Sequence, residues 1–103
     1  MVRVPTHRPP THPGEMLQEE FLAPLGISQS QLAADIKVPF QRINLIVNRK
    51  RAVTPDTALR FARYFGTSPD FWLNLQQRWD LYHALHSAEG KEIETIRPLK
   101  RAS

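Results

Sequence analysis

Four prolines stand at the starts of segments with helical periodicity, and they constrain the fold more than any other feature of the chain. They are Pro13, Pro39, Pro55 and Pro69. A proline is well tolerated in the first turn of a helix, because the N–H that it lacks would have no partner there. Thr54 and Ser68 stand directly before two of these prolines and can act as N-caps. The pattern predicts a chain of short helices.

The helix ends are marked as clearly as the starts. Gly26 and Gly66 stand where C-terminal glycines belong, and Ser28 with Gln31 three residues later forms a capping box at a further helix start. We expect Pro24 to end the first helix, because a proline in a helix interior costs about 3 kcal/mol. The apolar residues recur with the spacing of amphipathic helices. The predicted helices are 13–24, 28–36, 39–48, 55–65 and 69–87.

Length and composition confine these helices to one domain. The chain has 103 residues, which is enough for one modest core and too few for two. It has no cysteine, which excludes disulfides, Cys-ligated zinc and thiol catalysis. No apolar run reaches the roughly 20 residues of a membrane span or the form of a signal peptide. We therefore expect a cytoplasmic, all-α protein with an irregular arm at 1–11, a domain at 12–90 and a tail at 91–103. Within the tail, EIETIR at 92–97 is the one candidate for a short strand.

The charged residues are segregated along the chain. Lys and Arg number 14 against 10 Asp and Glu, for a net charge of +4. Between Pro13 and Ile36 every charged residue is acidic, whereas between Lys37 and Pro55 every one is basic. A basic stretch without a carboxylate suits a polyanion such as nucleic acid, but it is also compatible with a solvated face. The fold of the stretch has to decide between the two.

This basic stretch overlaps a helix-turn-helix pattern. The predicted helices 28–36 and 39–48 are short, a tight connection joins them, and the second carries basic residues. At 100° per residue, the side of the second helix that is expected to be buried holds Phe40, Ile43, Ile46 and Val47. The opposite side and its flanks are predicted to contact bases through Gln41, Arg42, Asn44 and Leu45. An amide can pair with adenine, an arginine with guanine and an apolar side chain with a thymine methyl group.

Phosphate contacts are predicted at the two ends of the helix-turn-helix. Gln29 and Ser30 lie in the first turn of helix 28–36, whose free N–H groups suit a phosphate. The end of the second helix and the basic loop after it can grip the DNA backbone through Asn48, Arg49, Lys50 and Arg51. The alternative is that these cations only complement the dipole at the helix C-terminus.

The last predicted helix carries more apolar residues than one face needs. A heptad-like stripe is formed by Trp72, Leu75, Trp79 and Tyr82. Three leucines lie largely off this stripe: Leu73, Leu81 and Leu85. A terminal helix on a small core needs one apolar face, so the surplus predicts a homodimer interface through the four stripe residues. The alternative is a broad core-facing side on a small domain.

Histidines offer the only hint of metal chemistry. Asp80, His83 and His86 are spaced three apart on one predicted helix, and His7 and His12 lie in the proline-rich arm. Metal binding needs a converging set of ligands, which nothing else in the sequence visibly supplies. The chain also lacks the sequence motifs of serine hydrolases, phosphate-binding loops and zinc proteases. We expect no metal, no cofactor and no enzymatic activity.

The sequence resembles the HigA (VapI-like) antitoxins, a family with the helix-turn-helix of Xre and phage repressors. The resemblance is carried by residues 28–76, SQSQLAADIKVPFQRINLIVNRKRAVTPDTALRFARYFGTSPDFWLNLQ, and by residues 12–28, HPGEMLQEEFLAPLGIS. It implies a five-helix, lambda-repressor-like fold and a homodimer that binds a palindromic operator in double-stranded DNA. It also implies an antitoxin that neutralises a HigB-like mRNA-cleaving toxin and represses its own operon. Leu45 departs from the family pattern, where we expect a polar or acidic residue.

Two other functions are compatible with the sequence. One is a stand-alone repressor of the same fold without a toxin, which the absence of a small basic reading frame beside the gene would favour. The other is a protein-interaction module in which the outer face of helix 39–48 meets a protein. Salt separates this module from a DNA-binding protein, because DNA affinity falls by roughly 0.9 log units per log unit of salt for each phosphate contacted.

Overall fold

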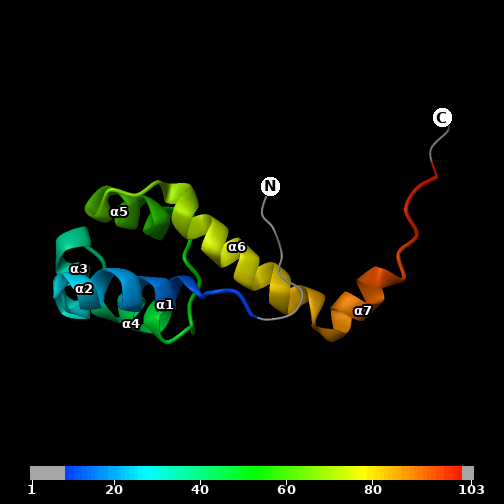
Figure 1. Cartoon of the computed structure of the whole chain (residues 1–103), viewed down its shortest axis with the longest axis horizontal. Coiled ribbons are helices and arrows are strands. Elements are labelled where there is room, and N and C mark those ends of the chain that lie inside the picture. Colours follow the sequence, from blue (N-terminus) through cyan, green and yellow to red (C-terminus); the bar gives the residue numbers. More distant parts are fainter. Residues whose placement is uncertain (1–8, 101–103) are drawn as a thin grey trace.

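The computed structural model describes residues 9–100, and within that range every regular element is a helix. The elements are α1 (Pro13–Met16), η1 (Leu17–Leu22), α2 (Ala23–Leu25), α3 (Gln29–Ile36), α4 (Phe40–Val47), α5 (Pro55–Phe65), α6 (Pro69–Leu85) and α7 (Ala88–Glu94). The elements α1 to α5 form a head, while α6 leads away from it and carries α7 at its far end (Figure 1). The all-α class and the five predicted helices are confirmed. Residues 1–8 of the predicted arm and 101–103 of the predicted tail lie outside the described residues.

The first helix runs through α1, η1 and α2 without a break and contains a π-helical segment. Its two most deeply buried leucines, Leu17 and Leu22, are five residues apart. In an α-helix, residues five apart point to different sides, whereas the i→i−5 hydrogen bonds of a π-helix bring such residues toward one side. The π segment therefore lets both leucines reach the core.

The first helix does not end at Pro24, contrary to the sequence prediction. It continues to Leu25 and ends at Gly26, whose φ of +66° is left-handed. Pro24 directly follows a π-type hydrogen bond from the N–H of Ala23 to the carbonyl of Gln18. Because the hydrogen-bond pattern changes at this point, the N–H that proline lacks interrupts no regular α-helical ladder.

Hydrogen bonds at the helix starts confirm the predicted serine caps. The Ser28 hydroxyl accepts from the N–H of Gln31 at 3.0 Å, and the Ser68 hydroxyl accepts from the N–H of Phe71 at 3.2 Å. Pro39 is a correction, because it is the residue before α4 rather than its first residue. The local signals in the sequence thus placed most helix ends to within a residue or two.

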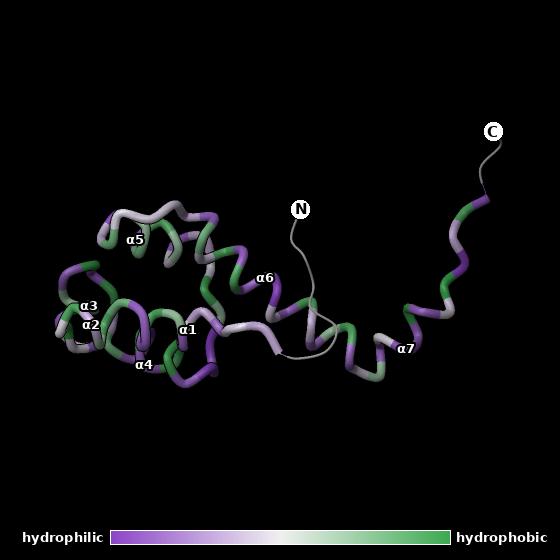
Figure 2. Tube along the Cα trace, viewed as in Figure 1, coloured by the Kyte–Doolittle hydropathy of each residue, from purple (hydrophilic) through white to green (hydrophobic). Residues whose placement is uncertain are grey.

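An aromatic cluster forms the centre of the core. Trp72 of α6 is fully buried, and its ring lies 4.9 Å from that of Phe61 and 5.0 Å from that of Phe21. Its indole N–H donates to the Thr67 hydroxyl at 2.8 Å. Aliphatic side chains of the head surround the cluster: Leu17, Leu22, Leu32, Ile36, Ile43 and Ile46. Hydrophobic stretches accordingly recur on every helix of the head (Figure 2).

The burial of the first half of α6 corrects the predicted dimer interface. Trp72 is 0% exposed and Leu75 is 8% exposed, so both belong to the chain's own core and are closed to a second copy. Trp79 and Tyr82 lie further along α6, where they are half-buried and outside the core cluster. The apolar stripe therefore serves the core up to the point where α6 leaves the head, and only its second half remains for another contact.

The prediction of a candidate strand at 92–97 is wrong, because helix α7 extends to Glu94. The Ser87 hydroxyl accepts from the N–H of Gly90 at 3.1 Å and caps the start of this helix. Gly90 approaches α6 so closely that a side chain there would overlap the backbone of Leu85. This contact holds α7 against the end of α6. None of the helices in residues 9–100 has the length and apolarity needed to cross a membrane.

Candidate nucleic-acid interface

A tight turn at residues 37–39 joins α3 to α4. Lys37 has a φ of +65°, and the N–H of Val38 donates to the carbonyl of Ala33 at 3.0 Å. This is the Schellman arrangement that ends many helices, with Lys37 in the position that glycine usually takes. The turn reverses the chain sharply, so that α4 packs against α3 as the second helix of a helix-turn-helix.

The inner side of α4 is fixed by close packing. Ile43 and Ile46 are fully buried, and Gly14 of α1 lies so close to the backbone of Ile46 that it has no room for a side chain. Phe40 was predicted to be buried and is instead 47% exposed. It is the first residue of α4, and a helical wheel gives its angle but not the point along the axis at which the core ends. The helix is thus held rigidly with an aromatic ring exposed at its start.

The outer side of α4 presents amide and apolar groups to solvent. Gln41 is exposed, and Leu45 is 36% exposed. Asn44 is half-buried, and its side-chain amide donates to the side-chain carbonyl of Gln29 at 3.1 Å. The Asn48 amide donates in turn to the side-chain carbonyl of Asn44 at 3.2 Å. This chain of three amides ties the first turn of α3 to the C-terminal end of α4.

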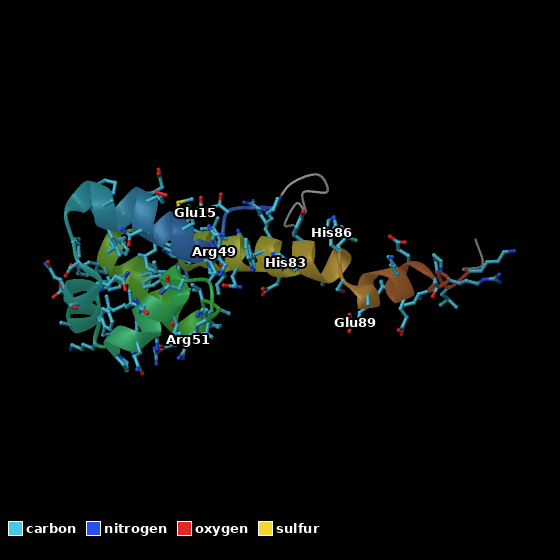
Figure 3. The ribbon with its side chains drawn as sticks, turned by 90° about the horizontal axis from the view of Figure 1, so that it is seen from below. Glu15, Arg49, Arg51, His83, His86 and Glu89 are labelled. Carbon is cyan, nitrogen blue, oxygen red and sulfur yellow. The ribbon has the colours of Figure 1, made fainter. Side chains whose placement is uncertain are left out.

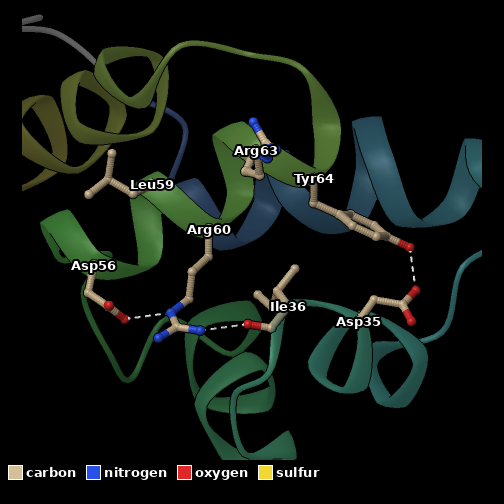
Figure 4. Close-up of a pocket in the computed structure, with 7 residues that line it drawn as sticks. All are labelled: Asp35, Ile36, Asp56, Leu59, Arg60, Arg63 and Tyr64. Atoms are coloured by element: carbon tan, nitrogen blue, oxygen red, sulfur yellow. Dashed lines mark hydrogen bonds and ion pairs between the residues drawn. The ribbon is translucent and has the colours of Figure 1, made fainter.

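Arg42, predicted to contact a base, is directed to α5 instead. Its guanidinium lies 3.0 Å from the carboxylate of Asp56, which also accepts from Arg60 at 2.9 Å. The hydrogen bond from Arg60, aided by Arg42, holds the pKa of Asp56 below its ordinary value. Arg60 also donates to the carbonyl of Ile36 at 2.8 Å, which connects α5 to the end of α3 (Figure 4). Arg42 therefore links two helices in this structure, and the base contact expected of it stays a prediction.

All three cations of the basic loop after α4 are exposed, and one of them, Arg49, is also paired within the chain. Arg49 has a φ of +62°, and its guanidinium lies 2.9 Å from the carboxylate of Glu15 and 5.8 Å from the centre of the Trp79 ring. Figure 3 shows Arg49 beside Glu15, with Arg51 nearer the lower edge of the head. Lys50 and Arg51 are exposed. The contacts of Arg49 with α1 and α6 fix the position from which the loop presents its other cations.

The remaining predicted phosphate contacts lie at the two ends of the amide chain. Gln29 and Ser30 occupy the first turn of α3, where Ser30 is exposed. Asn48 is exposed at the C-terminal end of α4, directly before the basic loop. The hydrogen bonds from Asn48 to Asn44 and from Asn44 to Gln29 therefore bring the predicted contacts at these two ends together.

His12 is a structural residue that the sequence reading did not identify as such. It is 2% exposed, its ring Nδ1 accepts from the N–H of Gly14 at 2.8 Å, and its ring meets that of Trp79 edge-on at 4.8 Å. Burial, followed by the nearby charge of Arg49, lowers its pKa. His12 thus caps α1 and packs α1 against α6, behind the basic loop.

The other histidines of the described range pack on aromatic rings. The ring of His83 lies 4.4 Å from that of Trp79, and the ring of His86 lies 4.3 Å from that of Tyr82. Among residues 9–100, no three His, Asp or Glu side chains are placed to hold a metal ion together. His7 lies outside that range.

The part of α6 beyond the head carries an exposed apolar surface. Leu81 and Leu85, with Ile93 of α7, are exposed and border a shallow groove of about 270 Å³ between the two helices. Tyr82 lies on the same stretch of α6, whereas Trp79 packs against His12 at the start of α1. Two of the three leucines that lie off the sequence stripe are therefore the ones available to a partner.

A larger groove of about 480 Å³ lies between α3 and α5 (Figure 4). Its two carboxylates are engaged within the chain, because Asp35 accepts from the Tyr64 hydroxyl at 2.6 Å and Asp56 holds the two arginines. The groove is thus a seam of contacts that hold α5 on the helix-turn-helix.

Comparison with known proteins relates this geometry to a family. The model of the HTH_3 family, helix-turn-helix, matches residues 18–72. Virulence-associated protein I of Dichelobacter nodosus is 46% identical over 88% of this chain and 82% of its own length. A HigA-family addiction module antidote protein from Coxiella burnetii has 42% identity and a TM-score of 0.81, over 89% of this chain and all of that one. The Pseudomonas aeruginosa antitoxin HigA, solved with the higBA promoter, has 44% identity and a TM-score of 0.82, over 88% of this chain and 99% of its own.

Proposed function

Because the chain belongs to the helix-turn-helix family HTH_3 and is similar over most of its length to HigA antitoxins, we propose that it is a DNA-binding antitoxin that represses its own operon. One observation carries the proposal: the outer side of α4 combines exposed amide and apolar groups with cations directly after its C-terminal end. Such a surface fits a duplex whose bases face the helix and whose phosphates meet its ends.

In this proposal α4 lies in the major groove. Gln41, Asn44 and Leu45 face the base edges, because they occupy the outer side of the helix. The phosphates meet the first turn of α3 and the end of α4 through Gln29, Ser30, Asn48, Arg49, Lys50 and Arg51. Arg49 contributes from a fixed position, because Glu15 holds its guanidinium.

The protein acts as a homodimer on a palindromic operator. A two-fold dimer presents two copies of α4 to two half-sites, as in other helix-turn-helix repressors. The surface that we assign to the dimer is the projecting part of α6 with α7, in place of the buried Trp72 and Leu75. Trp79 and Tyr82 remain in the assignment, to which Leu81 and Leu85 are added.

The relationship to HigA antitoxins extends the proposal to a second partner, a HigB-like toxin that the chain neutralises. The family is one of DNA-binding regulators, so the proposal contains no catalytic step and no cofactor. A protein that represses an operon has to reach the chromosome, and we infer a cytoplasmic location for that reason.

Titration of the purified chain against DNA tests the operator part of the proposal. The probes are a duplex from directly upstream of the chain's own gene and a scrambled duplex of the same composition. We expect tighter binding to the upstream duplex, by at least about a thousandfold, and an affinity for both that falls steeply between about 50 and 200 mM salt. Equal affinities for the two duplexes, or binding that salt does not weaken, would contradict operator recognition.

Co-expression tests the antitoxin part. Any small basic reading frame found next to the gene is expressed alone and together with this chain. We expect growth arrest in the first case, growth in the second, and co-purification of the two proteins. Operator binding without any such partner would instead favour the stand-alone repressor.

A further inference from the structure

We infer that α4 reads A·T base pairs, with Phe40 and Leu45 placed on thymine methyl groups and Gln41 placed on an adenine. The inference rests on the proposed operator binding and adds which bases the surface selects. Three observations carry it: the exposure of Phe40, the spacing of the two apolar side chains, and the engagement of Arg42 by Asp56.

The exposed side chain of Phe40 has no packing role in the core. Its side chain is 47% exposed, and it belongs neither to the core cluster nor to the partly buried residues packed against that cluster. It also takes part in none of the aromatic pairs found among residues 9–100. A large apolar ring facing water at the start of the helix that enters the groove points to a partner that buries it.

The second apolar side chain lies one and a half turns further along the same helix. Five residues separate Phe40 from Leu45, which corresponds to about 7.5 Å along the helix axis and about two base-pair steps. Gln41 follows Phe40 and faces outward between the two. At 100° per residue Phe40 and Leu45 point about 140° apart, with Gln41 at an angle between them, so the two apolar groups flank the amide on either side.

The chemistry of this surface fits A·T pairs and not G·C pairs. In the major groove only thymine carries a methyl group, and adenine offers the N6 and N7 pair that a glutamine amide matches. Guanine is read best by an arginine. Arg42 is the one cation within α4, and its guanidinium is held 3.0 Å from Asp56. In this structure the one cation of the helix is thus paired with α5, while two groups suited to thymine are exposed.

The experiment removes thymine methyl groups one at a time. The full chain first selects its best site from a library of random-sequence duplexes. Each thymine of that site is then replaced by uracil, which pairs identically but lacks the methyl group. We expect an A·T-rich half-site and two thymines at which uracil weakens binding about fourfold each, the effect of losing one buried methyl-sized contact. The slope of affinity against salt should stay the same, because no phosphate contact changes.

Substitutions assign each methyl group to its side chain. Phe40→Ala should bind about tenfold more weakly and lose its sensitivity to uracil at one of the two positions, while Leu45→Ala should lose it at the other. Both side chains are exposed, so both variants should melt as the parent does. The matched control is Leu59→Ala, which trims an exposed leucine of α5 and should keep both sensitivities.

The outcomes separate this inference from the function on which it rests. A parent chain that binds its selected site in a salt-dependent manner, but prefers G·C pairs or tolerates uracil at every position, overturns the thymine assignment and leaves operator binding intact. The same holds if Phe40→Ala and Leu45→Ala keep both uracil sensitivities. A parent chain that selects no sequence at all overturns operator binding and this inference together.

Discussion

At the scale of single residues, Asp56 determines where two arginine side chains are directed. Its carboxylate accepts from Arg42 of α4 and from Arg60 of its own helix, at 3.0 and 2.9 Å. These pairs are exposed to solvent and contribute little to stability, so their main effect is to orient the side chains. The pairing of Arg42 matters most, because it places the guanidinium on α5 rather than on the side of α4 that is proposed to face DNA.

Replacing Asp56 by asparagine should release Arg42 toward DNA. The Asp56→Asn variant keeps the size of the side chain and removes the charge that holds both arginines. We expect tighter binding to random-sequence duplexes and a salt slope steeper by about one phosphate contact, roughly 0.9 log units per log unit of salt. Fluorescence anisotropy at several salt concentrations measures both. Glu19→Gln is the control, since it removes one negative charge from an exposed residue of η1. If the slopes of the parent and Asp56→Asn coincide, Arg42 does not move to DNA.

His12 should make the fold sensitive to mild acid. Its Nδ1 has to be unprotonated to accept from the N–H of Gly14, and its pKa is lowered from an ordinary value of 6.5, first by burial and then by Arg49. Below pH 6.5 the unfolded chain therefore binds more protons than the folded one. The stabilisation is complete above that pH and is lost as the pH falls toward the lowered pKa. Asp56, whose pKa is lowered from 3.8, affects the stability of the fold only at lower pH.

Melting temperatures between pH 7.5 and pH 5 test this sensitivity. The parent should melt at a lower temperature at pH 5, and His12→Gln should show a flatter dependence on pH, because glutamine does not titrate. His86→Gln replaces an exposed histidine of the same chain and should keep the parent's dependence. A His12→Gln variant with the parent's pH dependence would show that another group is responsible.

Part of the surface that is proposed to face DNA could be predicted from the sequence, and part could not. The outward positions of Gln41 and Leu45 depend only on helical periodicity, so they were predictable once α4 was recognised. The pairing of Arg42 with Asp56 joins residues 14 apart in the chain, and the exposure of Phe40 depends on where the core ends. Both are properties of the packed molecule and leave no local signal.

At the scale of elements, α4 is positioned by a backbone contact with α1. Gly14 lies against the carbonyl of Ile46 and the Cα of Val47, which leaves no space for a side chain. The same end of α4 leads into the basic loop, whose Arg49 returns to Glu15 of α1. The first helix therefore supports α4 from behind, at the end where phosphates are proposed to bind.

Gly14→Ala should push α4 away from α1. A methyl group at this position meets backbone atoms, which cannot rotate aside, so we expect a destabilisation of about 1–3 kcal/mol or more and weaker operator binding. Gly66→Ala is the matched control. Its φ of +76° is strained for alanine, but nothing lies within 4 Å of the added atom, so about 1 kcal/mol is expected. Urea unfolding ranks the two variants. Equal losses would mean that α1 adapts and that the close contact does not position α4.

The element boundaries show which local signals are sufficient. Ser28, Ser68 and Gly66 act within a few residues of themselves, so the helix ends that they mark were predictable from the sequence. The π segment was not, because it arises from the burial of both Leu17 and Leu22 in a core formed by other helices. The strand expected at 92–97 failed for a related reason, since Ser87 and Gly90 dock a helix there instead.

At the scale of the whole molecule, the chain is a head with a projecting rod, about 55 Å along its longest axis. The motifs of the family lie in one continuous stretch, so the family could be predicted from residues 12–76 alone. The comparisons confirm it. The apolar stripe could not show which part of α6 is buried in the core and which part is left for a partner, because both kinds of contact use the same residue types. The exposed apolar surface on the rod remains the best support for pairing with a second copy.

A double substitution on the rod tests that pairing. Leu81 and Leu85 lie one turn apart on the exposed side of α6, so Leu81→Glu with Leu85→Glu places four carboxylates in a symmetric contact between two copies. We expect the parent to sediment at twice the chain mass at micromolar concentration and the double variant to sediment as a monomer. Its melting should change little, because neither leucine belongs to the core cluster.

The same variant separates the rod from the head in DNA binding. Two heads joined through their rods bind both half-sites in one event, whereas separate heads bind each half-site independently. The double variant should therefore lose at least about a hundredfold in affinity for a full palindromic operator and keep the parent's affinity for a single half-site. Leu59→Glu, an exposed leucine of α5, is the control for adding charge to an apolar surface residue and should sediment and bind as the parent does. A double variant that still sediments as a dimer would place the interface elsewhere on the molecule, and full operator affinity in a monomer would show that the two heads cooperate only on DNA.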